Sequence, residues 1–512
     1  MARRARTIWV QGFRGLNDEA APGMAKGEPV VTPDLRNVKL RSGQVLGRGG
    51  LSKYHSISTA SATTPVLGLF DYQLASGTNK LIRMTPTKLS VLDTVTPEWD
   101  DITGTDLTGA VTTRPQATII DDTLVFTNEG EDLPRKYTGT GNSAIIAAST
   151  SPYAKCIESY LGFLMLGNVS DSGAFTDVVD GHRMIRYSDD WDNNWTLCDG
   201  NELVLDETPG NLVAMKVLGR DLICYKDDGL VKVTWTGNQV RFNQQKIPFS
   251  LGCLAPLSVQ NVGELGHIFL GTDAGLYLVN GQTVQSLSHE TLKQTLPTTF
   301  SLAKLKYARS MVDQEEGTYY LFYDRTGLSG QALDSYVSYN FRTGEFSKGR
   351  IGESIYSVTN HRPTSQSELD LLLGTSTLVK EFDSGTNDDG VATERYYTTN
   401  WQSLGEEGIF EGARLLMRKS SLGRVKVSVA REFEQDFTNE QTFSLKGQLA
   451  SDENVELHYR APNLYGEWFN LKVRFFHDGA TTTTTLRRIG MEIRPMHSTG
   501  NTLPREGEGA NL

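Results

Sequence analysis

Long apolar stretches, helix-forming runs and prolines are all scarce in this sequence of 512 residues. No run of about 18 apolar residues occurs, so no transmembrane helix is expected, and the N-terminus lacks the apolar core of a secretory signal. Runs of Ala, Glu and Lys are few, whereas 50 glycines stand against 17 prolines. With many Thr, Ser, Val and Leu residues, this composition favours short strands joined by tight turns. We therefore expect an all-β protein that is made and kept in a cytoplasm-like compartment, or that leaves it by cell lysis.

Cysteine pairs and the common catalytic motifs are also missing. The four cysteines, Cys156, Cys198, Cys224 and Cys253, form no C-x-x-C pair and no Cys/His ligand spacing, and each lies in or beside an apolar stretch. Reduced, buried thiols are expected. No P-loop, H-E-x-x-H, G-x-S-x-G or catalytic cysteine signature occurs, and the acidic clusters lack the ligand spacing of a calcium loop. We therefore predict no enzyme activity, no metal site and no cofactor.

Charge is unevenly distributed along the chain. The net charge is -11, which argues against a protein that wraps nucleic acid over most of its surface. Residues 1–60 nevertheless carry ten Lys or Arg residues and only four acidic ones. This excess predicts a basic extension that docks onto an acidic or phosphate-rich partner, with Arg3, Arg4, Arg6 and Arg14 as candidate docking residues. A solvated, flexible end is the alternative.

A repeated strand–turn–strand pattern fills the middle of the chain. Its copies begin at residues 81, 124, 163, 222, 268, 320 and 371. A period of roughly 40 to 60 residues with three or four short strands is typical of β-propeller blades. Turn sequences such as Asn280–Gly281 separate the strands, where a positive φ is needed. The pattern predicts a propeller of about seven blades over residues 61–395.

The pattern changes after about residue 395 to longer strands in which apolar and polar residues alternate. Residues 425–429 (VKVSV) and 471–475 (LKVRF) are examples. Such alternation is expected for the half-buried strands of a sandwich. We predict a β-sandwich-like domain over residues 396–497 and a loose polar tail over residues 498–512.

One segment matches a known structural turn. Residues 188–196 (SDDWDNNWT) resemble the Asp box of sialidase-like propellers, with Asp192 in place of its glycine. In such a box the Asp side chain caps backbone N–H groups and the Trp packs between blades. Only one degenerate copy occurs, so Ser188, Asp190 and Trp195 are predicted to form a structural turn and not a glycosidase site.

Several ordered segments resemble bacteriophage tail nozzle proteins, a family also described as packaged-DNA stabilisation or tail hub proteins. The resemblance spans roughly residues 10 to 350 and rests on residues 12–17 (GFRGLN), 35–38 (LRNV), 43–50 (GQVLGRGG), 185–189 (IRYSD) with 195–196 (WT), 250–256 (SLGCLAP), 270–277 (LGTDAGLY) with 280–281 (NG), and 339–346 (YNFRTGEF). The chain departs from the family in lacking an obvious long insertion between blades, which implies a compact nozzle.

The resemblance implies a structural virion protein of a phage tail, assembled in the host cytoplasm. Its copies would form a ring, a hexamer by family analogy, that retains packaged DNA and conducts it during ejection. Implied partners are an adaptor or head-to-tail connector above, tail fibre or needle proteins below, and duplex DNA that passes the lumen without sequence-specific binding. An acidic lumen would let a duplex slide without sticking.

Two other functions remain open from the residues alone. One is a propeller that binds or cleaves host glycans, with Trp99, Trp191, Trp195 and Trp235 as aromatic residues available for stacking on sugars. The other is a scaffold propeller that offers a protein-binding face. Ring assembly separates the nozzle from both, because a ring predicts large side-to-side contacts, whereas a lectin can work as a monomer.

Overall fold

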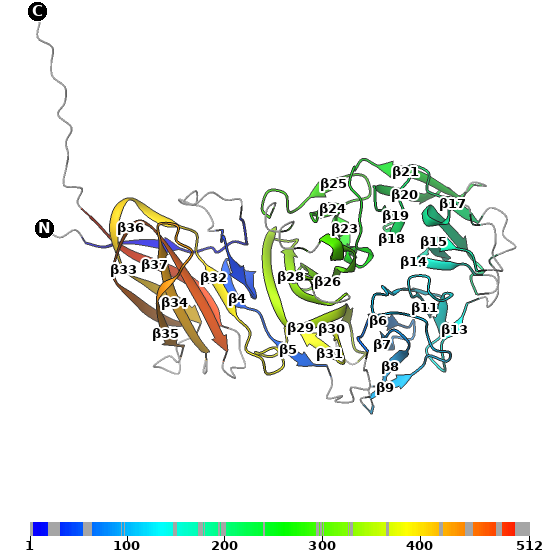
Figure 1. The fold of residues 1–512 in the computed structure, drawn as a ribbon, viewed down its shortest axis with the longest axis horizontal. Helices are drawn as coiled ribbons and strands as arrows, with labels where there is room; N and C mark the ends of the chain where they lie inside the picture. The colour runs from blue at the N-terminus through cyan, green and yellow to red at the C-terminus, as the bar shows by residue number, and fades with distance from the viewer. Residues whose placement is uncertain are drawn as a thin grey trace, which may run out of the picture. The chain divides into compact units, whose positions relative to one another are not determined.

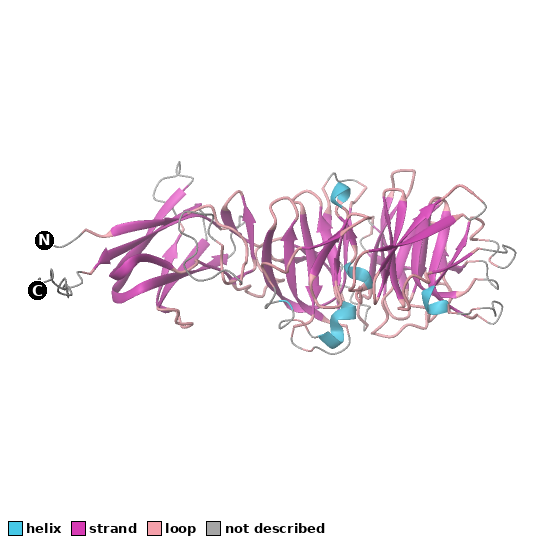
Figure 2. Cartoon of the chain, turned by 90° about the horizontal axis from the view of Figure 1, so that it is seen from above, coloured by secondary structure: helices cyan, strands magenta, loops and turns pink. Residues whose placement is uncertain are grey.

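A computed structural model describes residues 4–18, 31–54, 64–93, 95–96, 98–146, 151–172, 178, 180–192, 195, 201–238, 241–292, 296, 300, 302–325, 327, 331–364, 368–418, 423–445, 454–477 and 484–496. The chain forms two compact units. One consists of residues 49–393, and the other combines residues 1–48 with residues 394–512. Named strands pair antiparallel throughout the described residues, and the named helices there are short 3-10 turns (Figure 2).

The first five blades of the larger unit are four-stranded sheets (Figure 1). Blade 1 contains β6 (Gly68–Gln73), β7 (Asn79–Met84), β8 (Leu89–Asp93) and β9 (Glu98–Asp101); blade 2 contains β10 (Gln116–Ile120), β11 (Thr123–Thr127), β12 (Arg135–Tyr137) and β13 (Ala144–Ile145); blade 3 contains β14 (Tyr153–Tyr160), β15 (Phe163–Ser170), β16 (Met184–Ser188) and β17 (Glu202–Val204). Blade 4 contains β18 (Leu212–Leu218), β19 (Asp221–Lys226), β20 (Leu230–Trp235) and β21 (Phe242–Ile247); blade 5 contains β22 (Gln260–Asn261), β23 (His267–Leu270), β24 (Leu276–Val279) and β25 (Val284–Ser286). The 3-10 turns are η1 (Gly181–Arg183), η2 (Pro256–Ser258), η3 (Gly263–Leu265) and η4 (Leu302–Tyr307).

The last two blades share one seven-stranded sheet. Its strands are β26 (Arg309–Asp313), β27 (Thr318–Tyr323), β28 (Leu333–Asn340), β29 (Glu345–His361), β30 (Asp370–Thr375), β31 (Val379–Phe382) and β5 (Leu51–Lys53). The first half of β29 pairs with β28 and ends blade 6, whereas its second half pairs with β30 and begins blade 7. The described strands therefore form seven blades.

Ring closure follows from contacts between the first strands of neighbouring blades. β6, β10, β14 and β18 contact one another in order, η2 and β22 continue the ring to β26, and β29 returns it to β6. Buried apolar clusters fill the spaces between blades, such as Ile82, Met84, Leu124 and Phe126 between blades 1 and 2. The predicted all-β propeller is confirmed.

The smaller unit is a sandwich-like set of strands, as the alternating pattern predicted. Its strands are β1 (Arg6–Val10), β2 (Leu35–Arg36), β3 (Val38–Arg41), β4 (Gln44–Gly47), β32 (Arg395–Thr398), β33 (Gln402–Arg418), β34 (Gly423–Arg431), β35 (Thr438–Ser444), β36 (Asn454–His477) and β37 (Thr485–Pro495). β33 pairs with both β36 and β37. Every second residue of β34 and of the end of β36, including Val425, Val427, Leu471 and Val473, is fully buried.

The prediction of a separate arm over residues 1–60 is wrong. β1 and β4 pair with β37, β2 pairs with β32, and β5 completes blade 7 of the propeller. Val10, Phe13 and Leu35 are buried in the smaller unit. These short strands have too little apolar surface for a core of their own, so they complete sheets built from the distant end of the chain. The predicted tail over residues 498–512 lies outside the described residues.

Candidate functional site

The first strands of the seven blades surround a cavity of about 200 Å³ at the centre of the propeller. A second cavity of about 290 Å³ is lined by residues at or near the N-terminal ends of β10, β14, β18 and η2. Gln116 and Pro256 line both cavities, so the two lie next to each other. We call the first cavity the channel and the second the mouth.

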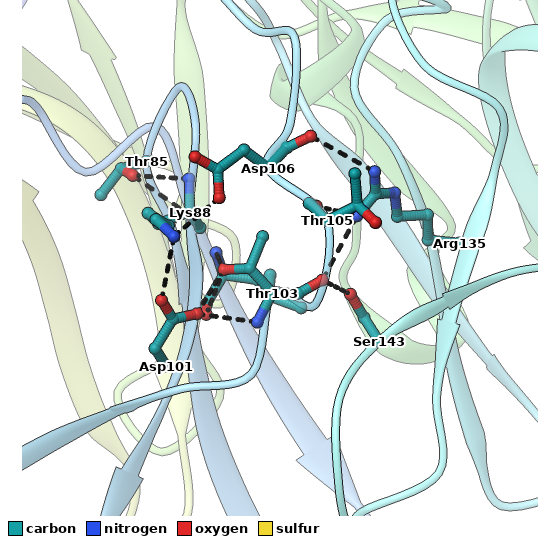
Figure 3. Close-up of polar contacts among 9 residues, drawn as sticks. Thr85, Lys88, Asp101, Thr103, Thr105, Asp106, Arg135 and Ser143 are labelled. Carbon is teal, nitrogen blue, oxygen red and sulfur yellow. Dashed lines mark hydrogen bonds and ion pairs between the residues drawn. The ribbon is translucent and has the colours of Figure 1, made fainter.

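A polar network fixes the linker between blades 1 and 2, which leads to the mouth (Figure 3). The guanidinium of buried Arg135 donates to the carbonyls of Thr103 at 3.3 Å, Thr105 at 2.5 Å and Asp106 at 3.5 Å. Ser143 Oγ also donates to the carbonyl of Thr103, at 2.7 Å. Burial lowers the pKa of Arg135. Backbone carbonyls of the linker therefore take the place of a carboxylate partner for this cation.

Lys88 joins the same network from the turn between β7 and β8. Its Nζ lies 2.7 Å from Asp106 Oδ1 and 3.1 Å from Asp101 Oδ2 (Figure 3). The two carboxylates raise the pKa of Lys88. Asp101 also accepts the backbone N–H of Thr103 at 2.8 Å. The two cations of this network, Lys88 and Arg135, balance its two carboxylates, Asp101 and Asp106. The network therefore has a structural role and holds the linker in place.

The end of the linker reaches across the mouth to blade 6. Arg114 pairs with Glu129 of blade 2, and its Nη1 donates to the carbonyl of Lys306, just before β26, at 3.2 Å. Gln331 makes a second bridge, because its Nε2 donates to the carbonyl of Thr113 at 3.1 Å. Arg114 is thus held at the mouth by contacts with Glu129 and Lys306 on two sides of the ring.

Charged groups continue inside the channel. Lys216 of β18 lies 3.5 Å from Glu158 of β14. Burial raises the pKa of Glu158 despite this neighbour. Arg309 of β26 lines the channel as well, and only 4% of its surface is exposed. Burial lowers the pKa of Arg309 to about 9. The channel is therefore polar and charged although apolar clusters surround it.

A wider groove of about 830 Å³ is lined by residues of blades 1 and 7. Asp93 and Asp100 come from blade 1, and Glu368, Asp370 and Glu381 come from blade 7 or the segment before it. Tyr54 OH donates to Asp370 Oδ2 at 3.0 Å, and His361 Nδ1 lies 2.7 Å from Asp71 Oδ1. Burial raises the pKa of the Tyr54 hydroxyl and of Glu381. The groove is strongly acidic.

The candidate docking arginines do not form a cluster. Arg3 lies outside the described residues. Arg4 and Arg14 are exposed, and Arg6 on β1 lies 3.6 Å from Glu406 with more than half of its side chain exposed. Arg488 stacks over the ring of Trp9, also on β1, with its Cζ 4.0 Å from the ring centroid. The described arginines thus lie on or beside an edge strand and not on a free arm.

The Asp-box-like turn follows β16 and packs between blades 2 and 3. Ser188 Oγ accepts the backbone N–H of Asp190 at 3.1 Å, so the hydroxyl caps this turn. Asp190 is exposed. Trp195 is buried in a cluster with Trp191 and residues of both blades, and its Nε1 donates to the carbonyl of Trp191 at 2.8 Å. The turn therefore has a structural environment, and its Ser has a capping role that the sequence pattern did not assign.

Reactive groups are scarce in the described residues. Cys156, Cys224 and Cys253 are buried and unpaired, and burial raises the pKa of Cys156 and Cys253 to about 12. Cys198 lies outside the described residues. The part of the chain that the structure describes holds no group of three His, Cys, Asp or Glu side chains suited to a metal ion. Its helices are all too short to cross a membrane.

Comparisons with known proteins add only distant structural similarities. No family model and no curated protein matches the chain. Similar solved structures include YCF48 from Cyanidioschyzon merolae, with 11% identity over 65% of this chain and 98% of that chain and a TM-score of 0.37. The Pan2 WD40 domain from Neurospora crassa has 9% identity over 67% and 96% and a TM-score of 0.36. The extracellular domain of the hybrid two component system BT4673 from B. thetaiotaomicron has 10% identity over 81% and 48% and a TM-score of 0.36. The fold assignment rests on the strand pairings and not on these similarities.

Proposed function

We propose that the protein is a structural subunit of a bacteriophage tail. Its copies form a ring-shaped nozzle or hub below the portal and adaptor, which retains packaged DNA and conducts it during ejection. The ring is a hexamer by analogy with the nozzle family. The observation that carries the proposal is the shared order of the motifs at residues 12–17, 35–50, 250–256, 270–277 and 339–346, together with the structural positions that their residues occupy.

The two N-terminal motifs contact each other in the smaller unit. The backbone N–H of Phe13 donates to the carbonyl of Gly43 at 3.1 Å, and the Phe13 side chain is fully buried. A Cβ added to Gly43, whose φ is +70°, would lie 3.0 Å from Gly12 Cα. Glycine at this position allows the close approach of the two segments. The motif residues thus serve packing, as expected for a structural protein.

The central motifs join blades 4 and 5. Cys253 N–H donates to the carbonyl of Lys226 at 2.8 Å, and Thr272 N–H donates to the carbonyl of Gly252 at 3.1 Å. A Cβ on Gly252 would lie only 2.1 Å from the backbone of Asp227. In the motif at residues 270–277, Asp273 accepts the N–H of Gly275 and the hydroxyl of Tyr277. These contacts give the motif residues packing and turn-forming roles.

Strand β1 is the element best suited to docking on a neighbour. Among the described strands β1 pairs only with β37, so its other edge presents unpaired backbone groups. Arg4, Arg6 and Trp9 are exposed there. An added strand from a partner would gain backbone hydrogen bonds, while arginines would favour an acidic partner. This edge is our candidate contact with the adaptor or a neighbouring copy.

Point variants test this role better than a truncation. Deleting residues 1–14 would remove Val10 and Phe13 from the core of the smaller unit, whereas Arg4→Glu/Arg6→Glu changes only exposed charges. We expect phage that carry the double variant to lose packaged DNA more often than wild type, most clearly at low salt. Lys246→Glu, exposed on β21, is the matched control. Normal genome retention by the double variant would contradict docking through β1.

A host-glycan-binding propeller is the second candidate, and the acidic groove between blades 1 and 7 favours it. Carboxylates such as Asp93 and Asp100 are suited to accept hydrogen bonds from sugar hydroxyls. Trp191 and Trp195, however, are buried, which leaves Trp235 at 39% exposure as the most accessible of the four proposed stacking residues. Binding of the full chain to a panel of host glycans, lost in Asp93→Asn/Asp100→Asn and retained in Lys246→Gln, would favour this candidate over the nozzle.

A further inference from the structure

We propose that the mouth and channel of the propeller bind a small oxyanion of phosphate size, either free or as the end of a small monoester. Arg309 is the central ligand, and Lys306 and Lys155 attract the anion. This inference concerns the interior of one propeller and holds whether or not the protein forms a phage nozzle.

Arg309 is a buried cation with few partners. Its Nη2 donates to Gln331 Oε1 at 2.9 Å, and its Nε has no hydrogen-bond partner. Within the described part of the chain no carboxylate forms an ion pair with it. A buried charge without a counter-ion is costly, so burial strongly favours binding of an anion at this position. The side chain lines the channel, where such an anion has access to it.

The cationic groups around Arg309 outnumber the carboxylates. Five cationic side chains line the mouth and channel in the described residues, namely Arg114, Lys155, Lys216, Lys306 and Arg309, and only three carboxylates do, namely Glu129, Glu158 and Asp227. Each of these carboxylates already has a partner: Glu129 pairs with Arg114, Glu158 with Lys216, and Asp227 accepts hydrogen bonds from Asn211. The cations exceed the carboxylates by two, and Lys155, Lys306 and Arg309 have no ion pair with any of these three carboxylates.

The volumes of the two cavities and the geometry of a guanidinium group fit a small anion. The channel of about 200 Å³ has roughly seven times the volume that one water occupies in the liquid, enough for a phosphate but not for a nucleic acid duplex. The mouth of about 290 Å³ has room for the organic part of a monoester. A guanidinium presents parallel N–H donors that match two oxygens of a tetrahedral oxyanion. Gln331 links Arg309 to the linker that carries Arg114, since it binds Arg309 and the carbonyl of Thr113.

Calorimetric titration of the full-length protein tests the proposal. Inorganic phosphate and glycerol phosphate are titrated separately, with sodium chloride at matched ionic strength as the reference. We expect saturable binding of one phosphate per chain and no saturable response to chloride. Equal affinities for the two ligands would assign a site for the free oxyanion, and tighter binding of glycerol phosphate would show that the mouth holds the organic part. Absence of saturable binding by either ligand overturns the proposal.

Variants locate the site. Arg309→Gln should weaken binding by on the order of tenfold or more, because a charge-assisted hydrogen bond is lost. Lys155→Gln/Lys306→Gln changes two exposed side chains and keeps the test valid if Arg309→Gln does not fold. Lys246→Gln, exposed on the outermost strand of blade 4, is the matched control and should bind as wild type. Wild-type affinity in both Arg309→Gln and Lys155→Gln/Lys306→Gln, or equal weakening in the control, would show that only adventitious ion binding occurs.

Discussion

Leu51 on β5 lies directly opposite Phe382 on β31 in the outermost strand pair of blade 7, and both side chains are buried in the same apolar cluster. The strand that closes the propeller ring therefore comes from the segment before blade 1. Because β5 belongs to the first part of the chain, the ring closes only when the ends of the propeller sequence have met. The cost in loop-closure entropy is offset by this buried pair and its backbone hydrogen bonds.

Leu51→Ala tests the closing strand. Truncation of a buried Leu leaves a cavity, so we expect a loss of about 2–5 kcal/mol in the free energy of unfolding of the propeller. Urea unfolding followed by tryptophan fluorescence measures it. Lys53→Ala, on an exposed position of the same strand, is the control and should change stability by less than about 0.5 kcal/mol. Equal stability of Leu51→Ala and wild type would contradict a role of β5 in ring closure.

The turn after β16 gives a second prediction. Ser188→Ala removes the hydroxyl that accepts the N–H of Asp190, and we expect a loss of about 0.5–2 kcal/mol, as for other side-chain caps. Substitution of the buried Ser188 by Val or Thr would be a poor control. Asp189→Ala, which changes an exposed neighbouring residue, is used as the control instead. Neither variant should create or abolish hydrolysis of sialosides. Hydrolysis by the wild-type protein that Asp190→Ala removes with the fold intact would refute the structural assignment of this turn.

His267 predicts a pH dependence of stability. Its Nδ1 lies 2.9 Å from the Tyr225 hydroxyl and its Nε2 lies 3.0 Å from the Val217 carbonyl, so the neutral ring is satisfied on both sides. Burial lowers its pKa from 6.5 to about 4. The unfolded chain binds the proton more tightly, so this contribution to stability is complete above about pH 6.5 and is lost as the pH falls toward 4.

A comparison with His267→Gln isolates the contribution of His267 to the pH dependence of stability. The shift corresponds to about 3 kcal/mol, and we expect the wild type to lose up to that amount relative to the variant between pH 7 and pH 4. Urea unfolding of both proteins at several pH values measures the difference. A difference between the two proteins that stays constant over this range would show that His267 does not titrate with unfolding.

The cysteines give a prediction of reactivity. Cys156, Cys224 and Cys253 are buried, and burial raises their thiol pKa values, so the thiolate is scarce at neutral pH. We expect these three residues to remain unmodified by iodoacetamide in the native protein and to react fully in urea. Peptide mass spectrometry reads each residue separately. Rapid native alkylation of Cys224 would contradict the packing between blades 3 and 4.

The repeated sequence pattern that predicted the blades corresponds to the second strand of each blade. The repeat copies at 81, 124, 163, 222, 268, 320 and 371 fall within or at the start of β7, β11, β15, β19, β23, β27 and β30. These strands are buried on both faces and therefore read as apolar runs. The first strands, such as β14 with Lys155 and Glu158, line the polar channel and lack that pattern. The repeat therefore indicated the number of blades and missed the strands that form their centre.

The pairing of the N-terminal strands and the channel cations were not predictable in the same way. Strands β1, β2, β4 and β5 find partners more than 300 residues away, and local patterning carries no information about such partners. Arg309 is the first residue of the short strand β26 (RSMVD), and Arg114 lies in a linker, so no spacing in the sequence joins them. Only the closed ring brings the linker and blade 6 together. Ser188 was recognised because its motif is local.

The central claim is that copies of this chain form a ring. Electron microscopy of the purified full-length protein, or of the tail that contains it, viewed down its axis with two-dimensional class averaging, tests this claim most directly. We predict closed rings of identical propeller-sized subunits around an open lumen, six by analogy with the nozzle family. Particles that remain single propellers at all concentrations, and tails that lack such a ring, would contradict it.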